Sequence, residues 1–254
     1  MKAIELILVS HWKYIDICED FIKLFKKNWP NCPYNLTISI KGKKKINYDK
    51  VIYNSDNCSL PKCIYNVVRQ SNSKYFFCFL GDAFFSRKID NNQVKNLVNS
   101  IKLNSIEYCC LIPRMPYLFT KKSIDSYIRK INYWDRYNVS FIAFVASKEF
   151  ISNKFSGNIS DYEFENSYIY NSFTYSKAYY YSCYAIVQKN IFHIVPAIEK
   201  GKWNIIGLLK LKCLNPKIIF SKRHTMSIYE MIYAIVSKVS RPLLSPNFRN
   251  RTRL

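Results

Sequence analysis

The sequence predicts an α/β fold in which a mostly parallel central sheet is flanked by helices, built as a single domain over residues 1–240. Two short apolar runs, AIELILV at 3–9 and YFFCFL at 75–80, have the composition of strands that are buried on both faces. Amphipathic stretches with helical spacing separate the apolar runs. Strands that alternate with helices in this way favour a parallel sheet.

The first amphipathic stretch begins just after the run at 3–9. Its apolar positions recur at helical spacing: Ile15, Cys18, Ile22, Phe25 and Trp29. Acidic residues lie toward its start and lysines toward its end, as the helix dipole favours, and Pro30 ends it.

The rest of the chain continues the alternation. Strands are expected at 35–40, 51–53, 107–112, 139–146 and 181–187. Helices are expected near 61–70, 91–102, 202–212 and 226–239, with Pro61 in a first turn. Ser147 is the expected cap of a further short helix, and the aromatic, polar stretch 155–176 is expected to be a site-forming loop.

Composition narrows the classes of protein to consider. Of 254 residues, 39 are Lys or Arg and 17 are Asp or Glu, which gives a net charge of +22, and 49% are hydrophobic. This hydrophobic content excludes a disordered chain, and the five glycines form no glycine-rich phosphate loop. Lys outnumbers Arg by 29 to 10, as an AT-rich genome would produce, so part of the charge reflects codon usage. A basic protein still attracts phosphate-bearing partners.

Cysteine usage and hydropathy indicate the compartment. Nine cysteines occur without any C-x-x-C pair, so we expect reduced, mostly buried thiols in a cytoplasmic protein. No run approaches the roughly 18 apolar residues of a membrane-spanning helix, and the start of the chain lacks the features of a secretory signal.

Three places could carry chemistry. Asp82 follows the central strand beside Gly81, where a carboxylate could hold Mg²⁺ or Mn²⁺ on a diphosphate; a simple turn is the alternative.

The acidic segment 161–165 (DYEFE) would place its carboxylates on one side of an extended strand, with Glu163 as a general base of raised pKa; a solvated loop is the alternative. Lys200 and Lys202 flank Gly201 before a helix and could bind phosphate, or merely precede a helix cap.

Histidines give a weaker signal. The three in the chain have no metal-ligand spacing, which argues against a histidine metal site or a Ser-His-Asp triad. His11 follows the first strand, in a position that would face a ligand, but packing explains it as well.

Several segments, taken in order, resemble glycosyltransferases of bacterial capsule and O-antigen clusters. The opening ILVSHWKYIDICEDFIKLFKKNWPNCPY is similar to the first strand, turn and helix of that family, and SKYFFCFLGDAFF is similar to its central strand. The later segments VSFIAFVASKEF, DYEFE and KGKW resemble further family motifs, so the resemblance runs from about residue 3 to 210.

The resemblance implies a GT-A-type, Rossmann-like fold that transfers a sugar from a nucleotide-sugar donor to a glycan or lipid-linked glycan acceptor. The residues that it implies for donor binding are Ser10, Tyr14, Gly81, Lys200 and Lys202. It implies a divalent cation, Mn²⁺ or Mg²⁺, at Asp82, the catalytic base at Glu163, and acceptor contacts at Tyr162 and Glu165.

The sequence departs from the family at the metal site. The family carries two adjacent acids after the central strand, whereas Asp82 stands between Gly81 and Ala83, so lysines would have to neutralise part of the diphosphate charge. A catalytically degenerate glycosyltransferase-like subunit is therefore an alternative.

A basic nucleic-acid-binding protein is the alternative from another class. We expect no nucleic-acid partner, because the aromatic residues lie mostly in strand-like runs and no binding motif is found. The basic tail 241–254 would instead hold the protein at anionic lipid on the inner face of the cytoplasmic membrane.

Overall fold

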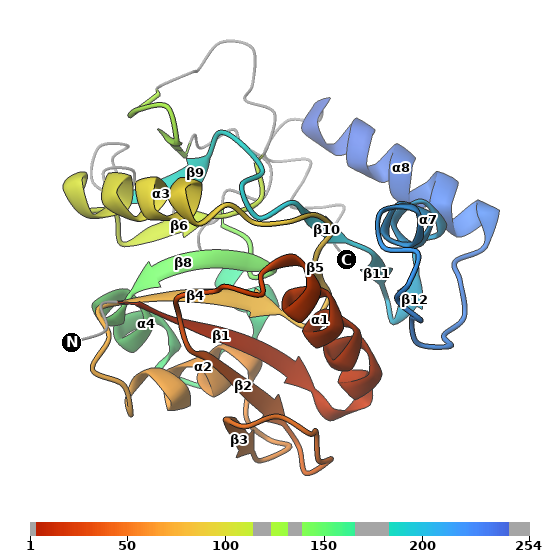
Figure 1. The fold of residues 1–254 in the computed structure, drawn as a ribbon, viewed down its shortest axis with the longest axis horizontal. Helices are drawn as coiled ribbons and strands as arrows, with labels where there is room; N and C mark the ends of the chain where they lie inside the picture. Colours follow the sequence, from red (N-terminus) through yellow and green to blue (C-terminus); the bar gives the residue numbers. More distant parts are fainter. Residues whose placement is uncertain (1–3, 114–122, 132–138, 166–182, 244–254) are drawn as a thin grey trace.

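The computed structural model describes residues 4–113, 123–131, 139–165 and 183–243, and its centre is an eight-stranded mixed sheet (Figure 1). Across the sheet the strands are β3 (Val51–Asn54), β2 (Leu36–Lys41), β1 (Ile4–His11), β4 (Tyr75–Leu80), β8 (Ala143–Ser147), β6 (Tyr108–Cys110), β9 (Tyr184–Val187) and β7 (Ile128–Lys130). The first four are parallel, β6 and β9 run in the same direction, and β8 and β7 are antiparallel to their neighbours. The predicted α/β fold with a mostly parallel sheet is confirmed.

The direction and length of β8 differ from the expectation for 139–146. The strand starts four residues later, at Ala143, and lies antiparallel between β4 and β6. Its five residues are all buried, as they would be in a parallel strand. A buried apolar run has the same composition in either direction, so the sequence pattern does not reveal the reversal.

Helices cover both faces of the sheet. The helices that cover it are α1 (Ile15–Asn28), α2 (Leu60–Val68), α3 (Asn91–Leu103) and α4 (Lys148–Phe155), while α7 (Ile205–Leu214) and α8 (Ile228–Leu243) lie to one side of the sheet (Figure 1). The chain moves from β1 through α1 to β2 on one side, and from β3 through α2 back past β1 to β4 on the other. Because both connections are expected to be right-handed, the reversal places α1 and α2 on opposite faces.

Local signals set the helix starts as expected. The N–H of Phe150 donates to Ser147 Oγ at 3.0 Å, so Ser147 caps α4, and Pro61 lies in the first turn of α2. The turn before α1 is a short 3₁₀ segment (Trp12–Tyr14). α8 extends to Leu243, into the expected basic tail, and residues 244–254 of that tail lie outside the described part of the chain.

Aromatic side chains form the core on both sides of β4. The rings of Phe79 and Phe85 are 5.0 Å apart in an edge-to-face arrangement, and Phe192 packs against both. Six of the nine cysteines are buried, and all nine are free thiols. Burial of these aromatics agrees with the expectation that core packing, and not base stacking, accounts for them.

Two small β-structures extend from the main sheet over its carboxyl edge. β5 (Ala83–Phe85) leaves the end of β4 and pairs antiparallel with β10 (Ile194–Pro196). A hairpin of β11 (Ile198–Glu199) and β12 (Lys202–Trp203) follows and leads into α7. The C-terminal part of the chain is thereby brought to the end of β4.

Gly207 allows α7 to lie against the segment between β10 and β11. A Cβ at Gly207 would lie 2.8 Å from Ala197 Cβ and 3.0 Å from Ala197 Cα, closer than packed atoms approach. We expect Gly207→Ala to lower the free energy of unfolding by about 1–3 kcal/mol, because backbone and helix must separate. Gly157→Ala is the matched control, since its Cβ would meet nothing within 4 Å. Urea denaturation of both variants measures the difference, and equal stabilities would contradict the packing role.

Within the described residues, no helix combines the length and apolarity needed to cross a membrane.

Candidate functional site

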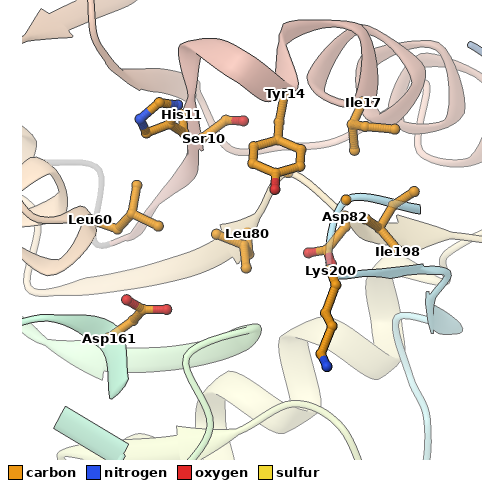
Figure 2. A pocket seen from close by; sticks show the side chains of 12 residues that line it. Ser10, His11, Tyr14, Ile17, Leu60, Leu80, Asp82, Asp161, Ile198 and Lys200 are labelled. Atoms are coloured by element: carbon orange, nitrogen blue, oxygen red, sulfur yellow. The ribbon is translucent and has the colours of Figure 1, made fainter. Parts of the chain in front are cut away.

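A pocket of about 350 Å³ opens at the carboxyl ends of β1 and β4 (Figure 2). The chain runs from β1 to β2 on one side and from β3 back to β4 on the other, so the order of strands reverses here. Ligands of open α/β sheets bind at such a reversal. The pocket is lined by Ser10, His11, Tyr14, Ile17, Leu60, Leu80, Gly81, Asp82, Asp161, Ile198, Lys200 and Gly201.

Ser10 and Gly81 form the floor, at the ends of the two adjacent strands. The N–H of Gly81 donates to the Val9 carbonyl at 3.0 Å. A Cβ on Gly81 would lie 3.0 Å from Ser10 Oγ and 3.3 Å from Ser10 Cβ. The glycine therefore lets the end of β4 lie directly against the serine side chain.

Asp82 is the most unusual group in the pocket. Its Oδ1 atom is fully buried and has no hydrogen-bond partner among the described residues. Burial raises the pKa of this carboxyl to about 6, against a smaller lowering by its own backbone N–H. A buried oxygen without a partner costs free energy, so a water molecule, ligand or ion is expected to supply the missing contact.

Asp82 fits a divalent cation that is shared with a substrate. In the described part of the chain no three His, Cys, Asp or Glu side chains come close enough together to hold a metal alone. Mg²⁺ is commonly held by one or two carboxylates, with water and substrate phosphates completing its coordination. The lone unpartnered oxygen of Asp82 suits that arrangement and not a metal site made only of protein groups.

Lys200 and Gly201 form the two-residue turn of the β11–β12 hairpin. Both have positive φ, 50° and 79°, as a type I′ turn requires. The expected position directly before a helix is wrong, because α7 starts at Ile205 and its cap is Asn204, whose Oδ1 accepts from the Gly207 N–H at 3.2 Å. Phosphate binding by the two lysines stays a prediction. The turn instead brings Lys200 to the pocket wall (Figure 2).

Lys202 lies on the next strand and has a different contact. Its Nζ is 2.7 Å from Glu230 Oε1 on α8, and both side chains are partly exposed. The side chain does not line the pocket. The pair of lysines expected at one phosphate is thus divided, with Lys200 at the pocket and Lys202 tied to α8.

Tyr14 joins the turn after β1 to the hairpin, and Arg223 holds this junction. A Cβ on Gly201 would lie 3.2 Å from Tyr14 Oη, so the tyrosine packs on the turn. The Arg223 guanidinium stacks 4.8 Å from the centre of the Tyr14 ring, forms two hydrogen bonds with Asp16, and donates to the Gly201 carbonyl at 3.2 Å. Sequence reasoning missed Arg223, because Tyr14 and Asp16 lie about 200 residues away in the chain and leave no local signal.

The acidic segment is helical, so the expected extended strand is wrong. Residues 161–165 form a helix whose first turn is closed by Ser160 and Glu163. Glu163 Oε2 accepts from the Ser160 N–H at 2.7 Å and from its hydroxyl at 2.9 Å, and the Glu163 N–H donates back to Ser160 Oγ at 3.0 Å. This is a capping box, and its S-x-x-E signature is present in the sequence.

The cap also reverses the expected ionisation of Glu163. Hydrogen bonds from the Ser160 backbone and hydroxyl lower the pKa of the glutamate, where a general base was expected to have a raised value. Asp161 lines the pocket instead (Figure 2). Glu165 accepts from the Phe141 N–H at 2.7 Å, and Tyr162 is 57% exposed and does not line the pocket.

His11 lies at the pocket edge, as the sequence allowed. Its Nδ1 accepts from the Lys13 N–H at 3.1 Å, which starts the turn before α1. Burial, followed by the charges of Lys41 and Lys13, lowers the pKa of the imidazole.

Comparison with known proteins identifies no family for this chain. No family model matches the chain, and no curated protein sequence matches it. Among solved structures, it is similar to a cytidylyltransferase from Leptospira borgpetersenii serovar Hardjo-bovis (strain JB197), with a TM-score of 0.49 and 13% sequence identity. That alignment covers 94% of this chain and 96% of the other. Membership of the capsule and O-antigen glycosyltransferases therefore stays a prediction.

Proposed function

We propose that the protein is a glycosyltransferase that moves a sugar from a nucleotide-sugar donor to a surface-glycan acceptor of the capsule, O-antigen or lipooligosaccharide class. The observation that carries the proposal is the unpartnered carboxylate oxygen of Asp82, in a pocket that Lys200 also lines. An acid for a cation and a lysine for phosphate, at the strand reversal, suit a nucleoside diphosphate.

On the donor side, four of the five implied residues have a physical role, and Lys202, tied to Glu230, does not. Ser10 and Tyr14 would border the nucleotide, and Gly81, whose Cβ would meet Ser10 Oγ, lets the two strand ends close the floor beneath it. Lys200 would stabilise the negative charge that develops on the departing nucleoside diphosphate. Mn²⁺ or Mg²⁺, held by Asp82, would supply Lewis-acid neutralisation of the same charge.

On the acceptor side, Asp161 is better placed than Glu163 to act as base. Asp161 lines the pocket, whereas Glu163 is occupied by the cap of its own helix. In an inverting transfer the acceptor oxygen would bond to the anomeric carbon and give its proton to Asp161. The bond between that carbon and the phosphate oxygen would break, and the nucleoside diphosphate would leave with the electron pair.

Release of nucleotide from labelled nucleotide sugars, in the presence of Mn²⁺ and a bacterial membrane lipid extract, tests the function. We expect Asp161→Asn to lower turnover by roughly 10²- to 10⁴-fold, as loss of a general base does. Glu163→Gln is the matched control in the same helical turn; a glutamine still caps the helix, so turnover should change less than about twofold.

Two results would contradict this account at different levels. Loss of turnover in Glu163→Gln with retention in Asp161→Asn would return the base to the residue that the family resemblance implies. Failure to bind any nucleotide sugar in calorimetry, with or without Mn²⁺, would overturn the glycosyltransferase proposal itself.

A donor-binding subunit without turnover is a second candidate, favoured by the single acid at the metal position. It predicts tight donor binding that Asp82→Asn weakens, with no sugar transfer to any acceptor. A cytoplasmic location beside the inner membrane, where lipid-linked acceptors are built, belongs to the leading proposal.

A further inference from the structure

Helix α8 carries an exposed apolar surface on its outer side. Five side chains, each 55–78% exposed, make up what we call the α8 stripe: Ile228, Tyr229, Ile232, Tyr233 and Val236. Their spacing of one, three and four residues places them on one face of the helix. In Figure 1 the helix lies at the edge of the molecule, on the far side of α7 from the central sheet.

The opposite face of α8 fixes this orientation. Glu230 is paired with Lys202 of β12, and Ala234 is buried at 5% exposure. The Ser227 N–H donates to Glu230 Oε2 at 2.8 Å, and the Glu230 N–H donates to Ser227 Oγ at 3.2 Å, which caps the helix start. An amphipathic helix normally turns its apolar face to the core, so a stripe held outward indicates a partner.

The positive charge of the segment that contains the stripe indicates the kind of partner. Residues 200–254 contain 12 Lys or Arg and a single acid, Glu230, which Lys202 already neutralises. After Glu230 the chain has no acid at all. An apolar stripe that includes two tyrosines, within a strongly basic segment, is suited to the boundary between anionic head groups and acyl chains.

A second copy of the chain fits this surface poorly. Joining two stripes would bring together two segments that each carry this excess of positive charge, in a protein of net charge +22. Like charges repel across such a contact, whereas an anionic bilayer attracts the whole segment.

We propose that α8 lies in the interface of an anionic lipid bilayer, with the α8 stripe inserted below the head groups and lysines and arginines of the C-terminal segment on the lipid phosphates. This inference goes beyond the sugar transfer proposed above and is independent of it. It also differs from attachment by the basic tail alone, because apolar insertion is required.

Co-sedimentation with lipid vesicles tests the proposal without any donor sugar. One set of vesicles is phosphatidylcholine alone, and the other contains about 30% phosphatidylglycerol, which makes the surface anionic. The stripe variant is Ile228→Gln, Ile232→Gln and Val236→Gln, because glutamine keeps helix propensity. The control is Leu103→Gln with Ile219→Gln, which removes apolar side chains that are 83% and 84% exposed elsewhere.

We expect the wild type and the control to bind vesicles that contain phosphatidylglycerol, and the stripe variant to bind at least about 100-fold more weakly, as removal of three inserted aliphatic side chains implies. Circular dichroism should show unchanged helix content in all three proteins. Replacing Arg249, Arg251 and Arg253 by Ser should weaken binding at low salt but leave the dependence on the stripe intact.

Equal binding by wild type and stripe variant would overturn the proposal, and so would loss of all binding in the arginine variant with no effect of the stripe. Sedimentation velocity supplies a further check. A wild-type dimer that the stripe variant converts to monomers would assign the surface to a second copy and would equally overturn it.

Discussion

The Asp82→Asn variant is expected to lose at least about 100-fold in sugar-transfer turnover and yet to be more stable than the wild type at pH 7. The loss of turnover follows from the proposed role, because a neutral amide holds the cation that neutralises the departing diphosphate much more weakly than a carboxylate does. The gain in stability follows from the structure alone. Oδ1 of this carboxylate is buried without a partner among the described residues, and an amide carries no charge to bury.

The pH dependence of the stability gain has a defined sign. Burial raises the pKa of Asp82 to about 6 in the folded protein, above the value of 3.8 for an unperturbed aspartate. Between these two values the folded state binds more protons than the unfolded state, so the wild type loses stability as the pH rises through this window. The loss is complete above pH 6 and amounts to about 3 kcal/mol at most. Asp82→Asn should remove it, and the two proteins should converge below pH 4.

Urea denaturation of both proteins at pH 4, 5, 6 and 7 measures this effect. Asp49→Asn is the control, since it removes the same charge from an exposed aspartate outside the pocket and should change neither stability nor turnover appreciably. Addition of Mg²⁺ with a nucleoside diphosphate should stabilise the wild type and not Asp82→Asn. An Asp82→Asn protein that is less stable at pH 7 would show that the carboxylate has a structural partner, and an active one would remove it from the site.

The backbone architecture was predictable because it rests on local patterns. The runs at 3–9 and 75–80 are β1 and β4, and the amphipathic stretch with Ile15 and Trp29 at its ends is α1, which ends at Asn28. Gly81 and Asp82 could be placed at the pocket, since the end of a buried central strand identifies the carboxyl edge of a parallel sheet. These positions could be predicted from the spacing of apolar side chains along the chain, without knowledge of contacts between distant segments.

Elements that depend on contacts between distant segments were not predictable. Lys200 reaches the pocket on the turn of a hairpin. Each strand of that hairpin is only two residues long, too short to show an alternation of apolar and polar residues. Arg223 acts through Asp16 and Tyr14, which no spacing rule connects to it. Glu163 is different, because the S-x-x-E signal of its cap was present and was outweighed by the alternation of acids and aromatics.

Replacement of Arg223 by lysine should weaken donor binding without changing the groups that contact the donor. Arg223 holds the turn before α1, through Asp16 and the Lys13 carbonyl, against the hairpin turn, through the Gly201 carbonyl. A lysine keeps the positive charge, but its single ammonium group cannot hydrogen-bond to the Asp16 carboxylate and to both backbone carbonyls at once, as the planar guanidinium does. We expect the free energy of unfolding to fall by about 1–2 kcal/mol, a modest value because Asp16 is partly exposed.

The pH dependence of stability tests whether the destabilisation by Arg223→Lys comes from loss of the contact between Arg223 and Asp16. Burial of its carboxyl acts to raise the pKa, but the hydrogen bond and charge of Arg223 outweigh burial and lower it. Because the pKa of Asp16 is lower in the folded than in the unfolded protein, its ionised carboxylate stabilises the fold at pH values above about 4, the unfolded pKa. That contribution is lost as the pH falls below this value. The stability difference between wild type and Arg223→Lys should therefore shrink in acid, and Asp16→Asn should cost little more in the Arg223→Lys background.

Steady-state kinetics distinguish positioning from catalysis. Because Arg223 does not line the pocket, Arg223→Lys should raise the KM for the donor several-fold and change kcat much less, whereas Asp82→Asn should lower kcat by at least about 100-fold. Additive effects of Asp16→Asn and Arg223→Lys on stability would show that the two side chains act separately. A fall in kcat with unchanged KM would place Arg223 among the reacting groups. Either result would contradict its assignment as the residue that holds the two pocket walls together.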